Sequence, residues 1–117
     1  MKHDRLLAEY QELVIPKIVY HFSPVKILIT GSRVKGTATK DSDIDVIIVA
    51  DAFLGVPFIR RMVLVLKSAR FKKHVDYFCY TPEEFERIKT QLCHLDFFSL
   101  KLGKNLTLVE ALQGYQK

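Results

Sequence analysis

GSRVKGTATKDSDIDVIIV, residues 31–49, is the stretch around which this sequence is organised. It runs into Ile44–Ala50 (IDVIIVA), a nearly continuous apolar run that indicates a strand buried on both faces. Residues 31–42 before it are rich in Gly, Ser, Thr and Lys, and we expect a loop or a short helical turn there. The pattern therefore predicts a polar loop that leads into a central strand.

Asp43 and Asp45 stand at the start of that strand, two positions apart. Residues with this spacing on a strand project from the same face, so the two carboxylates point the same way. Like charges this close repel one another, and a divalent cation relieves the repulsion. Oxygen ligands favour hard ions, so we expect Mg²⁺ at this pair, with Mn²⁺ as the alternative.

Asp76 is the third carboxylate of interest, because it interrupts the apolar strand predicted over His74–Tyr80 (HVDYFCY). A charge inside a buried strand is costly unless it is paired or bound to a metal ion. If residues 74–80 lie beside residues 44–50, Asp76 completes a three-carboxylate cluster. Such a cluster can hold two ions for in-line phosphoryl or nucleotidyl transfer.

Gly31 and Ser32 follow the strand predicted over Val25–Thr30. Gly31 allows a close backbone approach, and the Ser32 hydroxyl with nearby N–H groups suits a phosphate. Arg33 and Lys35 either reach a β- or γ-phosphate or are solvated surface cations. Gly-Ser alone is usually a turn and Asp-x-Asp alone is often a cap, but the two in this order, followed by a strand with Asp, indicate a functional site.

The remaining elements follow from periodicity and caps. Residues 4–19 predict a helix with an apolar stripe that includes Leu13, and Pro16 would kink or end it. Residues 57–70 predict a second helix that begins at Pro57. The remaining expectations are a helix from a Thr81/Glu84 capping box to about 92, a second helical piece through 101, and a short strand at Leu106–Val109. The order favours an α/β fold of the α+β type, a small mixed sheet with helices on one face.

Composition sets the broad class. The chain has 117 residues, which suits a single domain over 1–117, and its net charge of +5 favours anionic partners. The cations of residues 60–73 are either a binding surface for an acidic partner or nucleic acid, or a solvated face. Cys79 and Cys93 suggest reduced, buried thiols rather than a disulfide framework. The sequence has neither an apolar signal region nor a run near the roughly 20 residues that span a bilayer, so we expect a cytoplasmic protein.

These motifs together resemble the signature of the polymerase-beta-like nucleotidyltransferase superfamily, and are most similar to its minimal nucleotidyltransferases, the MNT proteins. The resemblance covers roughly residues 5–110 and includes TPEEF, residues 81–85. The residues that match the family's site are Gly31, Ser32, Asp43, Asp45 and Asp76.

The resemblance implies a polymerase-beta-like nucleotidyltransferase fold and Mg²⁺-dependent transfer of a nucleoside monophosphate, usually AMP from ATP, onto a hydroxyl. By resemblance, Ser32 contacts the triphosphate, Asp43 and Asp45 bind two Mg²⁺ ions, and Asp76 binds one ion and helps to deprotonate the acceptor. Minimal members often pair with a small helical HEPN protein in modules that resemble toxin–antitoxin systems.

Three hypotheses for the function follow. The first is an enzyme that modifies a protein partner and acts as the antitoxin of such a pair. The second is a non-catalytic antitoxin that covers its partner, and the third is transfer to a small molecule such as an aminoglycoside. The sequence leaves open the acceptor, the preferred base, direct nucleic-acid binding and homo-oligomer formation.

Overall fold

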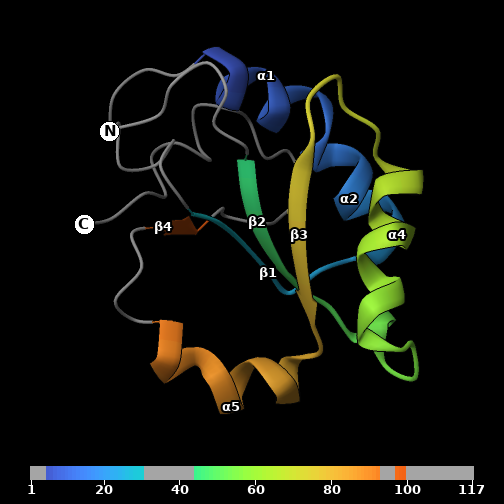
Figure 1. Ribbon diagram of the computed structural model, residues 1–117, viewed down its shortest axis with the longest axis vertical. Helices are drawn as coiled ribbons and strands as arrows, with labels where there is room; N and C mark the ends of the chain where they lie inside the picture. The colour runs from blue at the N-terminus through green and yellow to red at the C-terminus, as the bar shows by residue number, and fades with distance from the viewer. Residues whose placement is uncertain (1–4, 31–43, 93–96, 100–117) are drawn as a thin grey trace.

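A computed structural model describes residues 5–30, 44–92 and 97–99. Its centre is a mixed four-stranded sheet in the order β3-β2-β1-β4 (Figure 1). The strands are β1 (Lys26–Thr30), β2 (Ile44–Val49), β3 (Val75–Tyr80) and β4 (Phe97–Ser99). β1 is antiparallel to both β2 and β4, whereas β2 and β3 are parallel. The predicted small mixed sheet of an α+β fold is confirmed.

The N-terminal segment forms two helices, α1 (Arg5–Leu13) and α2 (Ile15–Phe22), where we predicted one over residues 4–19. Pro16 lies in the first turn of α2, which is where a helix tolerates a residue without an N–H donor. The predicted effect of Pro16 is therefore confirmed. Leu13 was wrongly placed in the buried stripe, because 52% of it is exposed.

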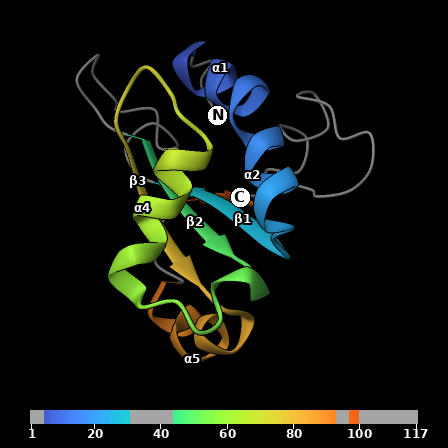
Figure 2. The same ribbon diagram turned by 90° about the vertical axis from the view of Figure 1, so that its right-hand side faces the viewer.

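One face of the sheet is closed by three helices, α1, α2 and α4 (Phe58–Ser68). Figure 2 looks onto this face, with α2 and α4 lying across the strands. Side chains at alternate strand positions enter the same core as the inward side chains of these helices. The strand residues in this core are Ile27, Ile29, Ile44, Val46, Ile48, Val75, Tyr77 and Cys79.

On the opposite face, α5 (Pro82–Leu92) is the helix that the described residues provide, and it packs against one end of the sheet. Phe85 of α5 packs with Leu28, Ile47 and Val49 in a second, smaller buried cluster. Figures 1 and 2 both show α5 at the far end of the molecule from α1. The expectation of helices on one face was therefore wrong. Because β2 is buried on both faces, the sheet requires apolar cover on each side.

The start of α5 forms the predicted capping box. Glu84 Oε1 accepts a hydrogen bond from the Thr81 N–H at 2.9 Å, and the Glu84 N–H donates to Thr81 Oγ1 at 3.3 Å. The second helical piece through 101 is wrong, because residues 97–99 instead form β4 beside β1. The strand predicted at 106–109 lies outside the described residues.

Arg61 connects α4 to β3 and to the start of α5. Only 5% of it is exposed, so residues 60–73 are not a uniform basic surface. Its guanidinium donates to the carbonyl oxygens of Val56 at 2.9 Å and Cys79 at 3.1 Å, and its two terminal nitrogens pair with the Glu84 carboxylate. One side chain on α4 thus fixes the preceding turn, β3 and the start of α5.

Two further observations concern the Cys79 thiol and the lengths of the helices. Cys79 is a buried free thiol, as predicted, and burial raises its pKa to about 12. Cys93 lies outside the described residues. None of the helices in the described part of the chain has the length and apolar character needed to cross a membrane.

Candidate active site

Asp45 and Asp76 face each other across the two parallel strands. The register pairs Asp45 of β2 with Asp76 of β3. Neighbouring strands in a sheet lie about 4.8 Å apart, and residues in register on parallel strands project from the same face. The strand adjacency that the sequence argument assumed is therefore observed, and it brings two of the predicted carboxylates together.

Both carboxylates lie on the face that α5 covers only in part. Their strand neighbours, Ile44 and Val46 on β2 and Val75 on β3, are 0–1% exposed and point into the closed core. Asp45 is partly exposed, and 38% of the Asp76 side chain is exposed. The alternation of a strand thus delivers two anionic groups to an accessible surface while adjacent positions build the core.

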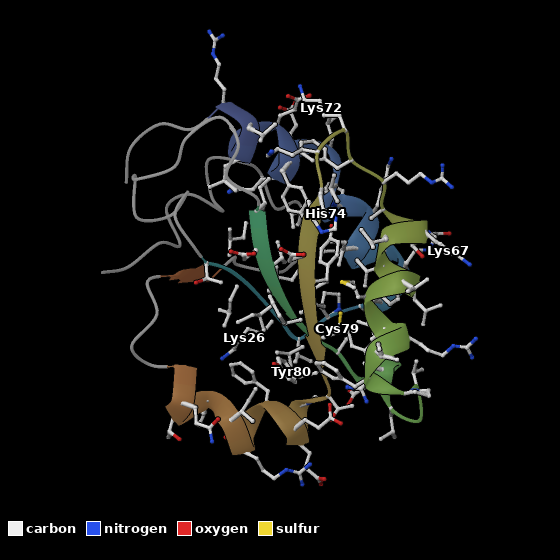
Figure 3. The ribbon with its side chains drawn as sticks, in the orientation of Figure 1. Lys26, Lys67, Lys72, His74, Cys79 and Tyr80 are labelled. Atoms are coloured by element: carbon white, nitrogen blue, oxygen red, sulfur yellow. The ribbon has the colours of Figure 1, made fainter. Side chains whose placement is uncertain are left out.

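His74, the residue that precedes β3, contacts Asp76. Its Nε2 lies 2.8 Å from Asp76 Oδ1, at the end of β3 where Figure 3 labels the imidazole. The sequence analysis did not assign His74 to the site. Its spacing of two residues from Asp76, on one strand face, was the available signal.

The strand end that precedes the Gly-Ser motif lies beside Asp45. Thr30, the last residue of β1, is paired with Asp45 in the antiparallel register. β1 therefore ends, and β2 begins, at the same end of the sheet as the two carboxylates. The other predicted site residues lie outside the described residues: Gly31, Ser32, Arg33, Lys35 and Asp43.

The chemistry of the described side chains suits a hard divalent cation. Asp45 and Asp76 offer carboxylate oxygens, which Mg²⁺ and Mn²⁺ prefer, and both are accessible from solvent. Within residues 5–30, 44–92 and 97–99, no three His, Cys, Asp or Glu side chains gather as a metal site. Asp43, the third carboxylate predicted for this site, lies outside those ranges. The donors present fit the predicted ion without forming its complete ligand set.

The family comparison decides which chemistry this site belongs to. Residues 14–113 match the model of the nucleotidyltransferase domain family. The chain belongs to this family. The match covers both carboxylate strands and the whole of the Gly-Ser to Asp-x-Asp stretch, so the general chemistry of the domain is transfer of a nucleoside monophosphate from a nucleoside triphosphate.

A solved structure agrees with this assignment. The fold is similar to that of a Sulfolobus solfataricus protein, provisionally described as a nucleotidyltransferase, whose crystal structure was determined at 1.40 Å. The two chains are 26% identical, with a TM-score of 0.57, over 89% of this chain and 85% of the other. No curated protein matches this chain at a significant level. The resemblance to MNT proteins in particular stays a prediction.

Proposed function

We propose that this protein is a Mg²⁺-dependent nucleotidyltransferase that moves AMP from ATP onto a hydroxyl group of a partner protein and releases pyrophosphate. The observation that carries the proposal is the register pairing of Asp45 with Asp76 on the partly open face of the sheet. Two adjacent carboxylates on a strand pair suit nucleotidyl transfer, because that reaction uses divalent ions, which carboxylates would hold beside the triphosphate.

The residues of this chain would divide the work in the following way. Asp45, with Asp43, would hold the divalent ions, and Asp76 would hold one ion and accept the proton of the attacking hydroxyl. Bound Mg²⁺ would neutralise charge on the triphosphate and lower the pKa of the acceptor hydroxyl. His74 would keep the Asp76 carboxylate oriented through its 2.8 Å contact. Ser32, Arg33 and Lys35 would bind the phosphates.

A protein acceptor is favoured over a small molecule by the accessibility of the two carboxylates and by the charge of the chain. Within the described residues, Asp45 and Asp76 are both partly exposed, which suits an acceptor presented by a second macromolecule. The net charge of +5 suits an acidic partner. The proposed setting is a toxin–antitoxin pair with a small helical HEPN-type partner.

The test is transfer of label from α-³²P-labelled ATP to the product of the adjacent gene in the presence of Mg²⁺. The wild-type protein is expected to label that partner, and the Asp45→Asn and Asp76→Asn variants are not. Asp51→Asn is the matched control, because Asp51 is an exposed carboxylate in the 3₁₀ turn η1 (Asp51–Phe53), beyond the far end of β2 from Asp45.

The same assay separates the alternatives. Neutralisation of the partner that survives both substitutions, with no label on the wild-type reaction product, would replace the enzyme with an antitoxin that acts by binding alone. Label that appears on an aminoglycoside and never on protein would replace the protein acceptor with a small molecule. Loss of labelling in Asp51→Asn would contradict the assignment of the site.

A further inference from the structure

The outward side of α4 and the turn before it expose several large apolar side chains. Ile59 is 79% exposed, and Leu54, Val63 and Leu64 are 78%, 44% and 41% exposed. Isolated apolar residues at a surface are ordinary, but a contiguous group on one helix marks an interaction site more often than chance. The group lies on α4 and so on the other side of the sheet from Asp45 and Asp76.

The exposure follows from the helical period. Ile59, Val63 and Lys67 recur every four residues and form one row along the outside of α4. The inward row, at Arg61 and Val65, is 5% and 0% exposed and packs toward the sheet. The helix therefore already buries one complete face, and its second apolar row has no position in the core of this chain.

This outer row and the Gly55–Pro57 turn line one groove, whose apolar lining includes Ile59, Val63 and Leu64. Arg61 holds the turn against the helix through its 2.9 Å hydrogen bond to the Val56 carbonyl. Gly55 adopts φ +81°, the left-handed conformation that glycine enters without strain. The groove is thus formed by buried contacts of the fold itself. We call it the α4 groove.

The charges at the α4 groove are of one sign. Arg60 and Lys67 line it, and none of the described residues that line it is acidic. Both side chains are exposed, and Figure 3 shows Lys67 projecting from the side of α4 that faces away from the sheet. The Glu84 carboxylate, which pairs with α4, is held by Arg61 on the inner side. The surface is therefore apolar along its centre and positive along its rim.

We propose that the α4 groove binds an amphipathic helix of a partner protein, with its apolar stripe against Ile59 and Val63 and its Asp or Glu residues beside Arg60 and Lys67. A helix laid in an apolar groove is a recurring mode of recognition, and carboxylates opposite the rim complete the charge match. The binding needs no transfer activity and leaves the Asp45/Asp76 face uncovered.

Two other occupants fit less well. A second copy docked symmetrically through α4 would bring its own Arg60 and Lys67 against the same cations, which costs energy. An anionic membrane matches the charge, but the apolar residues line a concave surface between the Gly55–Pro57 turn and α4. A helix fills such a groove, whereas a bilayer surface is better matched by a protruding apolar tip.

The test uses two synthetic helical peptides with the same leucine stripe, one flanked by Glu and the other by Lys, titrated into the protein by calorimetry. We expect the Glu-flanked peptide to bind about tenfold more tightly, because its carboxylates can pair with Arg60 and Lys67, whereas lysines at the same positions are repelled by them. Ile59→Glu is expected to abolish binding. The control Leu13→Glu alters a large apolar side chain on α1 that is also exposed, at 52%, and this variant should bind as the wild type does.

A charge-reversal variant tests the role given to Arg60 and Lys67. Arg60→Glu/Lys67→Glu should reverse the preference, so that the Lys-flanked peptide binds more tightly. Absence of binding by the Glu-flanked peptide, or binding that survives Ile59→Glu in a protein with an unchanged melting temperature, would overturn the proposal. So would a wild-type dimer in sedimentation equilibrium that Ile59→Glu dissociates, or Ile59-dependent binding to phosphatidylserine vesicles without peptide binding. None of these results depends on nucleotidyl transfer.

Discussion

The two faces of the sheet are built from alternating residues of the same strands, yet they differ in almost every physical respect. On the closed face, Ile44, Val46 and Val75 are almost fully buried under three helices. On the other face, Asp45 lies between Ile44 and Val46 in sequence and Asp76 follows Val75. Both carboxylates remain accessible. Within the part of the chain that the structure describes, the helix on that face is α5, which packs around Phe85 at one end.

The difference suggests a division of labour within each strand. Burial of apolar side chains on one face supplies the stability that allows two carboxylates to be held side by side on the other. Substitutions one residue apart should then have different consequences, one for activity and the other for folding.

The largest effect is expected for Asp45→Asn and Asp76→Asn. Each removes a proposed metal-binding carboxylate, so transfer activity should fall by more than the roughly 10–100-fold typical for loss of an outer-shell partner of a metal site. The free energy of unfolding should change little, because reduced repulsion between the two carboxylates offsets lost contacts such as that of Asp76 with His74. Single-turnover transfer and urea denaturation of the same preparations measure the two quantities. Parallel losses of activity and stability would contradict the division.

Ile48→Ala tests the closed face. Ile48 is fully buried, so the substitution should lower the free energy of unfolding by roughly 2–5 kcal/mol. Activity per folded molecule should be retained. Phe78→Ala is the matched change on the open face, where 42% of the side chain is exposed, and it should cost less than Ile48→Ala. Equal costs at the two positions, measured by chemical denaturation, would argue against one dominant core.

Arg61→Met tests the link between the faces, because Arg61 joins α4 on one side to Glu84 of α5 on the other. The variant leaves the Val56 and Cys79 carbonyl oxygens without this donor. We expect a loss of about 2–3 kcal/mol, below the usual cost of breaking a buried pair because Glu84 is partly exposed. Arg60→Met, at the exposed neighbour, should be close to neutral by thermal denaturation. An unchanged free energy of unfolding in Arg61→Met would show that Arg61 does not stabilise the contact between α4 and α5.

The smallest effect is a pH dependence that arises from Glu84. The hydrogen bond from Arg61, followed by that from the Thr81 N–H, lowers the pKa of Glu84 from 4.5 to about 2. Because the folded pKa is depressed, the ionised carboxylate stabilises the fold above about pH 4.5, and this contribution is lost as the pH falls toward 2. Glu84→Gln should therefore be less stable than wild type at pH 6, with the gap narrowing at pH 3. A gap that is constant across this range would refute the assignment.

Much of this comparison could be predicted from the sequence, since it depends on local periodicity. The apolar run at residues 44–50 indicated a buried strand, and the spacing of Asp45 and Asp76 within apolar segments indicated two charged positions that needed a partner. The Thr81/Glu84 capping box was predicted from four consecutive residues and is confirmed. Such features are encoded by neighbours in the chain.

The features that were missed depend on contacts between distant residues. Nothing local distinguishes the sheet face that α5 covers, and β4 is a strand because residues 97–99 pair with β1. Arg61 reads as one of several cations in residues 60–73, yet it is buried because Glu84 and two carbonyl oxygens surround it. Long-range pairing decides these positions, and local propensity is a weak guide to it.

The central claim is that the Asp45/Asp76 face holds the divalent ion of a nucleotidyltransferase. The most direct measurement is electron paramagnetic resonance of Mn²⁺ titrated into the protein with a non-hydrolysable ATP analogue. We expect saturable Mn²⁺ binding in the wild type and in Asp51→Asn. The Asp45→Asn/Asp76→Asn double variant should lose this binding while its melting temperature stays unchanged. Equal Mn²⁺ affinity in the double variant and the wild type would contradict it.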